Sequence, residues 1–234
     1  MHGVREKLPE RSTVMREEDG SEYMEEKNRK LTEAEKRRLA HFEEVKEAHI
    51  RDGYEVKELT IGIVKANVYA ILMALPLCLV TVLPFILLNR GKLYFEGNPL
   101  ISMVLYVIAL VVLVVVHELI HGLTWSMFAE NHFKSIEFGI MKEYMTPYCT
   151  CTVPLKKGAY IAGALMPLII LGIIPSIIAI FTGSFFLLAI GFVMILAAGG
   201  DIMIVMKLLG YKSDAEDVLI YDHPTQAGSV ILER

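Results

Sequence analysis

The sequence has little of what stabilises a small secreted protein. It contains three cysteines, Cys78, Cys149 and Cys151, in 234 residues, too few for a disulfide framework. The Cys-x-Cys pair suits either metal binding or two side chains on one strand face. The first twenty residues have no apolar stretch, so we expect no cleavable signal peptide. A net charge of −4 built from both signs gives no indication of nucleic-acid binding.

Charged residues become scarce after residue 57. Residues 1–57 hold 13 of the 23 Lys and Arg residues and 15 of the 27 Asp and Glu residues. The whole chain is 54% hydrophobic, with a mean hydropathy of +0.46, too apolar for an ordinary soluble domain. We therefore expect a polar cytoplasmic arm at 1–57, a membrane domain at 58–209 and a cytoplasmic tail at 210–234.

The arm divides into two parts. Residues 1–30 are rich in charge and poor in apolar side chains, which predicts disorder. Thr32 and Glu35 fit a capping box, which predicts an amphipathic helix over about 33–52. This helix is expected to pack on its own domain, although the membrane surface or another protein are alternatives.

Four apolar segments follow, and each is about long enough to cross a bilayer. They span about 66–88, 99–128, 159–181 and 185–209. The fold class is therefore predicted to be an all-α polytopic membrane protein with four transmembrane helices. The distribution of Lys and Arg around the segments favours both termini and the 129–158 loop in the cytoplasm, so the protein should be multi-pass with cytoplasmic ends.

The 129–158 loop has the composition of a β-hairpin. Residues 134–141 and 148–154 are strand-like, and a turn is expected around 143–147. A hairpin here would emerge beside the end of the second segment and could bind an extended substrate by strand addition. A plain cytoplasmic connector is the alternative.

The second apolar segment contains the HExxH sequence of zinc proteases, His117-Glu118-Leu119-Ile120-His121. Residues 100–116 before it carry no charge. Residues i and i+4 of a helix share one face, so His117 and His121 can bind one metal ion. Glu118 lies beside them, where it can reach a metal-bound water. An ionised Glu in hydrocarbon is costly, which indicates a functional role.

A zinc site with two histidines needs a third protein ligand and an open position. Asp201 is the candidate, because it lies about as deep in the fourth segment as His117 lies in the second. Gly199 and Gly200 beside it would allow close helix approach. Asp201 could instead hold a histidine N–H from outside the coordination sphere. The loop offers three other ligands, Glu137, Glu143 and His132.

These residues predict an intramembrane zinc metalloprotease that hydrolyses peptide bonds of membrane-anchored protein substrates. Zn²⁺ would activate a water, and Glu118 would act as general base and pass the proton to the leaving amine. Candidates for oxyanion stabilisation are Tyr144, Tyr148 and His132. A membrane metal transporter and a non-catalytic zinc-binding membrane adaptor are the alternatives.

The chain resembles the putative zincin peptidase family of unknown function, which is similar in plan to the site-2 intramembrane zinc metalloproteases. The residues that carry the resemblance are HELIHG at 117–122, Tyr148 to Cys151 with Pro154-Leu155, Pro167, Gly200-Asp201 and Tyr221 to Pro224. The resemblance implies zinc ligands at His117 and His121, a catalytic Glu118 and a distal aspartate at Asp201. The Asn-x-x-Pro and Asp-Gly elements usual around that aspartate in site-2 proteases are absent.

Overall fold

A computed structural model describes residues 31–89, 98–141 and 146–234. The predictions for residues 1–30, for Glu143 and for Tyr144 therefore lie outside the described residues, as does most of the predicted turn. The described chain from Leu31 onward is one compact unit that is mostly helical and contains small antiparallel sheets.

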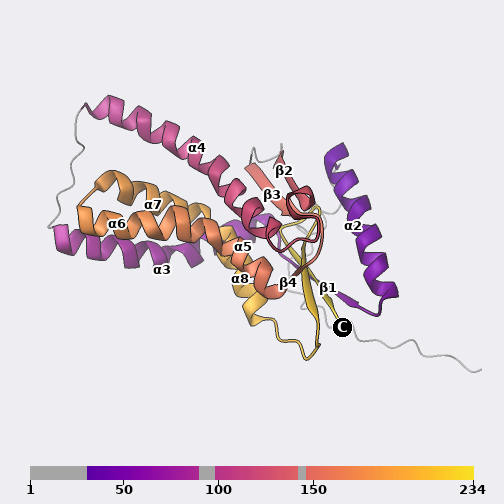
Figure 1. Ribbon diagram of the computed structural model, residues 1–234. Coiled ribbons are helices and arrows are strands. Elements are labelled where there is room, and N and C mark those ends of the chain that lie inside the picture. The colour runs from indigo at the N-terminus through magenta and orange to yellow at the C-terminus, as the bar shows by residue number, and fades with distance from the viewer. Residues whose placement is uncertain (1–30, 90–97, 142–145) are drawn as a thin grey trace, which may run out of the picture. The chain divides into compact units, whose positions relative to one another are not determined.

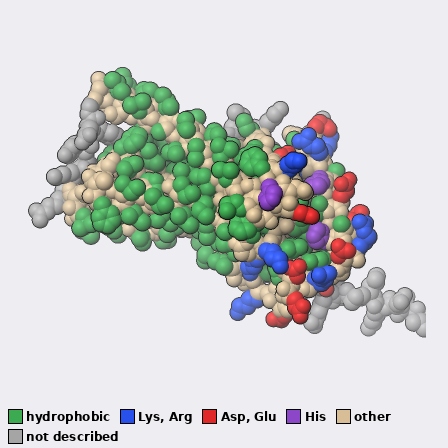
Figure 2. Space-filling view, viewed as in Figure 1, with side chains coloured by type: hydrophobic (Ala, Val, Ile, Leu, Met, Phe, Trp, Pro, Cys, Tyr) green, Lys and Arg blue, Asp and Glu red, His purple; other side chains and the backbone are tan. Residues whose placement is uncertain are grey.

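Three long apolar helices can each cross a membrane (Figure 1). The first is α3, Ile63–Asn89, and the second is α4, Pro99–Ser126. The third combines α5, Lys157–Pro167, a π-helical turn η2, Leu168–Ile173, and α6, Ile174–Thr182. Apolar side chains cover these helices, as a membrane-embedded surface requires (Figure 2). The structure is thus compatible with a multi-pass membrane protein.

The fourth apolar segment, predicted at about 185–209, forms two helices and not one. Helix α7, Phe185–Ala197, and helix α8, Gly199–Gly210, meet at a bend of 48°. The described residues therefore hold three spans, or four if the bent pair counts as one. A Cβ on Gly199 would lie 2.5 Å from the Ala70 carbonyl oxygen of α3, so glycine permits the close approach there. A Cβ on Gly200 would meet nothing within 4 Å.

A four-stranded antiparallel sheet was not predicted, and it corrects the all-α description. Its strand order is β1–β6–β5–β4. The strands are β1, Glu55–Thr60, β4, Leu155–Lys156, β5, Val218–Asp222, and β6, Gly228–Glu233. The segment predicted as a C-terminal tail therefore supplies two strands of a folded sheet. The sheet joins the residues just before α3, just before α5 and just after α8, so those helix ends lie on one side of the membrane domain.

The two faces of the sheet pack on different partners because strand residues alternate in direction. Ile220 and Ile231 face the ends of the membrane helices, where they pack with Trp125, Tyr160 and Leu208. The opposite face contacts α2, Glu33–Arg51, through the buried Phe42. The predicted capping box is present at the start of α2, with Thr32 and Glu35 bonded reciprocally.

Two further strands lie in the 129–158 loop. Strand β2, Ile136–Met141, follows a 3₁₀ turn, η1, His132–Ser135, and pairs antiparallel with β3, Thr146–Cys151. Strand β3 packs against α4, and its C-terminal end lies near β5. The charged side chains gather over this sheet-containing end of the described unit (Figure 2).

Candidate metal centre

Helix α4 brings two buried histidines to one face. His117 and His121 are one turn apart, and their exposed fractions are 7% and 4%. Their Nε2 atoms lie 3.1 Å from each other. The Nδ1 of His121 donates to the Gly163 carbonyl oxygen of α5 at 2.9 Å, so a neutral His121 presents the lone pair of Nε2. The rings therefore point their ligand atoms at a shared position.

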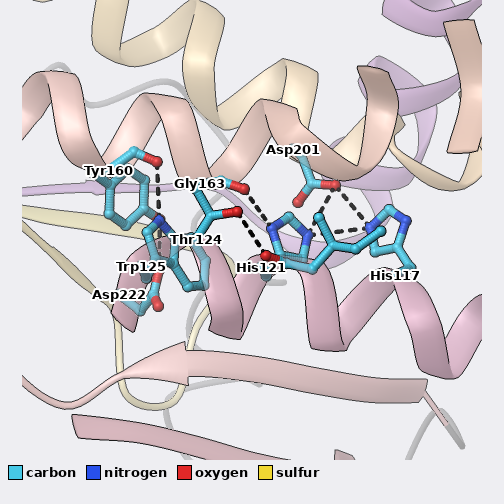
Figure 3. Close-up of polar contacts among 9 residues, drawn as sticks. His117, His121, Thr124, Trp125, Tyr160, Gly163, Asp201 and Asp222 are labelled. Carbon is cyan, nitrogen blue, oxygen red and sulfur yellow. Dashed lines mark hydrogen bonds and ion pairs between the residues drawn. The ribbon is translucent and has the colours of Figure 1, made fainter. Parts of the chain in front are cut away.

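Asp201 completes a group of three (Figure 3). The bend at Ala198 starts α8 there and places Asp201 in its first turn. The Asp201 Oδ2 lies 3.2 Å from His117 Nε2 and 3.5 Å from His121 Nε2. Ligand atoms at zinc–nitrogen and zinc–oxygen bond lengths on a tetrahedron are separated by about 3.3 Å. The three atoms thus have the spacing of three corners of a zinc site.

The chemistry of this donor set also fits a cation. Asp201 and His121 both present electron pairs, so a hydrogen on His117 Nε2 could not bond both in good geometry. With that hydrogen on Nδ1 instead, all three atoms offer lone pairs to one point. The Nδ1 of His117 is buried and has no hydrogen-bond partner among the described residues. A divalent ion at the shared position would offset the repulsion among the three lone pairs. Zinc suits a site made of two imidazoles and a carboxylate.

Glu118 lies beside this group on α4 and is partly buried. The backbone N–H of Cys149 on β3 points toward its carboxylate. The register explains this contact. Thr152 donates its N–H to Ser135, so alternate residues of β3 face β2, and the N–H groups of Cys149 and Cys151 face outward.

The loop alternatives have other partners. Glu137 is paired with Arg37 of α2 at 3.4 Å, and His132 Nδ1 lies 3.2 Å from the Ser126 carbonyl oxygen. Neither joins the group of three. Tyr148, an oxyanion candidate, is bonded through its hydroxyl to Arg38, whose guanidinium also lies over its ring.

The two cysteines of β3 are not part of the group either. Burial raises the pKa of the Cys151 thiol to about 11 and also raises the pKa of the Cys149 thiol. Both thiols are therefore protonated at neutral pH. The Cys-x-Cys pair has a structural place in β3.

A cleft of about 480 Å³ opens next to the site, between α2, β3 and the segment Tyr221–Gly228. Its lining includes Cys149, whose N–H reaches Glu118, and Ile204, which lies one turn after Asp201 on α8. The cleft therefore extends to residues beside the candidate metal centre, and none of His117, Glu118, His121 and Asp201 lines it.

Aromatic rings extend the site beyond the residues found from the sequence (Figure 3). Trp125 stacks on His121 with ring centroids 5.1 Å apart, and Tyr160 stacks on Trp125 at 5.4 Å. Trp125 Nε1 donates to the Tyr160 carbonyl oxygen at 3.0 Å. Trp125 is four residues after His121, so helical spacing alone could have placed it on the histidine face. No feature of the sequence indicated that Tyr160 or Gly163 lies beside the histidines.

The comparison with protein families confirms the resemblance to the putative zincin peptidase family. A family model described as "Putative zincin peptidase" matches residues 110–215, a range that contains His117, Glu118, His121 and Asp201. This match indicates a zinc metallopeptidase, and zinc is the metal that it implies. No curated protein and no solved structure matches the chain.

Proposed function

We propose that this protein is an intramembrane zinc metalloprotease that cleaves membrane-anchored protein substrates. In this proposal His117, His121 and Asp201 hold the metal ion, and Glu118 is the general base. The observation that carries the proposal is the triangle of His117 Nε2, His121 Nε2 and Asp201 Oδ2, with sides of 3.1, 3.2 and 3.5 Å, beside a glutamate on an apolar helix.

The chemical roles follow from what each side chain offers. Zinc bound at this position would act as a Lewis acid on a scissile carbonyl and lower the pKa of a water at its open position. Glu118 would accept the proton of the attacking water and deliver it to the leaving amine. The Cys149 N–H faces the Glu118 carboxylate, and Gly163 fixes the His121 tautomer.

The position of the site supports a substrate that spans or adjoins the membrane. His117 lies in the half of α4 nearer the four-stranded sheet, and α4 as a whole is long and apolar enough to span a bilayer. We propose that the sheet end is cytoplasmic, because the Lys and Arg residues gather there. A substrate segment would then approach Glu118 from the cytoplasmic side, through the cleft that Glu137 of β2 and Cys149 of β3 both line.

Strand addition needs a specific edge. On the outward edge of β3, the N–H of Cys149 is directed to Glu118 and the N–H of Cys151 bonds Asp222. An incoming strand would therefore compete with two carboxylates for this edge. The outward edge of β2 has no strand beside it in the described part of the chain. We propose that β2 is the edge available for substrate pairing.

The structure also bears on the transporter alternative. A transport pathway needs successive binding positions across the membrane. In residues 31–89, 98–141 and 146–234, His117, His121 and Asp201 form the single group of three potential ligands. One group next to a glutamate favours catalysis over transport.

The first test is the metal content of the protein purified in detergent. Wild type should bind about one zinc per chain, and His117→Ala and Asp201→Asn should bind much less. His132→Ala is the matched control, because this histidine bonds the Ser126 carbonyl and lies outside the group. A zinc-free wild type after zinc addition, or zinc loss only in His132→Ala, would contradict the proposed site.

The second test is proteolysis in cells. Membranes from cells producing wild type or Glu118→Gln would be compared by mass spectrometry of protein N-termini. The proposal expects new N-termini within or next to transmembrane segments in wild type alone. If both membranes gave the same N-termini while wild type held zinc, the adaptor alternative would replace the protease.

A further inference from the structure

Asp222 forms a partly buried polar cluster outside the HExxH helix. Its Oδ1 accepts from the Tyr160 hydroxyl, and its Oδ2 accepts from the Thr150 hydroxyl at 2.9 Å and from the Cys151 N–H at 3.4 Å. One carboxylate of β5 therefore joins α5 to β3. Asp222 lies outside the range that the family model matches.

The strand pattern explains why Asp222 points toward the helices. Residues i and i+2 of a strand share a face. Val218 and Ile220 belong to the cluster that packs on the helix ends, whereas Leu219 and Tyr221 pack toward Phe42. Asp222 lies on the same face of β5 as Val218 and Ile220. The sheet therefore delivers a carboxylate to the same interface that holds Trp125 and Tyr160.

The first path from Asp222 leads to His121. Tyr160, which is 2% exposed, is held at its hydroxyl by Asp222, and its ring stacks on Trp125 at an interplanar angle of 26°. Trp125 in turn stacks on His121 at 16°. Its Nε1 is bonded to the Tyr160 backbone, and one turn later Gly163 accepts from His121. The orientation of the His121 ring thus depends on where Tyr160 lies (Figure 3).

The second path leads to Glu118. Asp222 bonds Thr150 and Cys151 on β3, and the neighbouring Cys149 directs its N–H toward Glu118. Strand β3 is thereby held against the face of α4 that carries the glutamate.

We propose that Asp222 is a positioning residue of the metal centre, which sets His121 through the Tyr160–Trp125 stack and Glu118 through β3. This inference rests on the proposed zinc site. The sheet is then a functional part of the site, because it fixes the geometry of both a metal ligand and the general base. Residues that orient metal ligands from outside the coordination sphere commonly change metal affinity by 10-fold to 100-fold when mutated.

The chain offers a specific probe, because Trp125 is its one tryptophan. Its emission reports the ring stack directly, and zinc bound by the adjacent His121 should change that emission. The experiment measures Trp125 emission without zinc, and then zinc affinity by titration against a competing chelator, in wild type, Asp222→Asn and Tyr160→Phe. Tyr160→Phe keeps the ring and the backbone acceptor and removes only the hydroxyl bonded to Asp222.

Asp217→Asn is the matched control. This aspartate immediately precedes β5 and accepts from the Tyr54 hydroxyl at 2.7 Å. The same chemical change is thus made beside the same strand, at a tyrosine contact with no path to Trp125.

We expect Asp222→Asn and Tyr160→Phe to shift the emission and to weaken zinc binding about tenfold, with Asp217→Asn equal to wild type. The double variant of Asp222→Asn and Tyr160→Phe should lose less zinc affinity than the product of the two single fold-losses. If Asp222→Asn fails to fold, Tyr160→Phe decides. Wild-type values in both variants, or an equal loss in Asp217→Asn, would overturn the inference while leaving the zinc site intact. A wild type without zinc would instead overturn the proposed function, and this inference with it.

Discussion

His121 donates its Nδ1 hydrogen to the backbone carbonyl oxygen of Gly163. Because a carbonyl oxygen only accepts hydrogen bonds, this contact leaves the Nε2 lone pair of a neutral ring facing His117 and Asp201. Helix α5 therefore helps to decide which histidine atom is available to a metal ion. The HExxH sequence supplies two histidines, and the neighbouring helix fixes the orientation of His121.

Glu118→Gln should separate metal binding from catalysis. Glutamine has nearly the same shape and cannot accept the proton, so zinc content should stay near that of wild type while cleavage falls by about 10²-fold to 10⁴-fold. Glu137→Gln is the control, since that loop carboxylate pairs with Arg37. The measurement is zinc per chain together with the rate of cleavage of a substrate identified from the N-terminal comparison. Unchanged turnover in Glu118→Gln would exclude its role as the base.

Gly163→Ala should disturb the ring stack. A Cβ at this position would lie 2.1 Å from the Trp125 ring, so the indole must move away from its place between His121 and Tyr160. Overpacking of this kind costs about 1 to 3 kcal/mol. The midpoint temperature of unfolding in detergent and the zinc affinity should both fall.

Gly158→Ala, on the same helix, is the control for that change. A Cβ at Gly158 would meet no other atom within 4 Å. This variant should match wild type or be slightly more stable, since alanine loses less backbone entropy in a helix. Equal behaviour of the two alanine variants would show that the stack tolerates displacement.

The local parts of the site could be predicted from the sequence because helical spacing is regular. HExxH placed two imidazoles on one face, and an isolated acid at a similar position in the last apolar segment identified Asp201. Hydropathy likewise located the apolar helices. The bend between α7 and α8 leaves no mark in the hydropathy, which is continuous through it, and the close approach of Gly199 to α3 is a tertiary contact.

The sheet could not be predicted for a different reason. Strand β1 pairs with β6 from the other end of the chain, with Glu55 opposite Glu233. Short strands rich in charge carry a weak periodic signal, and their partners are set by tertiary structure. Asp222 was therefore visible only as part of the Tyr221 to Pro224 segment that carries the family resemblance, and its contact with Tyr160 is set by the fold.

Phe42→Ala should show that α2 is an integral part of the folded unit. Phe42 is 2% exposed and packs with Tyr221, Val230 and Leu232 on the outer face of the sheet. Its removal should cost about 3 to 5 kcal/mol, as for other buried aromatic residues. Ile50, on the same helix, is 49% exposed, and Ile50→Ala should change the unfolding midpoint little. Equal midpoints for the two variants would indicate that α2 is only loosely attached.

Because of Glu233, the stability of the folded protein should fall with pH in the acidic range. Burial alone would raise the pKa of this carboxyl, but hydrogen bonds from Lys57, Ser213 and Tyr211 outweigh it and hold the pKa below its usual range. A carboxyl whose pKa is lowered by folding contributes stability above its unfolded pKa of about 4.3. That contribution is lost as the pH falls through the lower value of the folded state. Lys57, whose pKa is raised, stays charged throughout this range.

The comparison is wild type against Glu233→Gln, followed by the unfolding midpoint in detergent from pH 7 to pH 3. Because the Lys57 side chain is 45% exposed, solvent screens the ion pair, and we expect an advantage of only about 1 kcal/mol for wild type at neutral pH. Glutamine resembles the protonated acid, so the two curves should converge as the pH falls below about 4. A difference that stayed constant down to pH 3 would mean that the charge on Glu233 does not contribute, and that the stability of the sheet comes from its apolar faces.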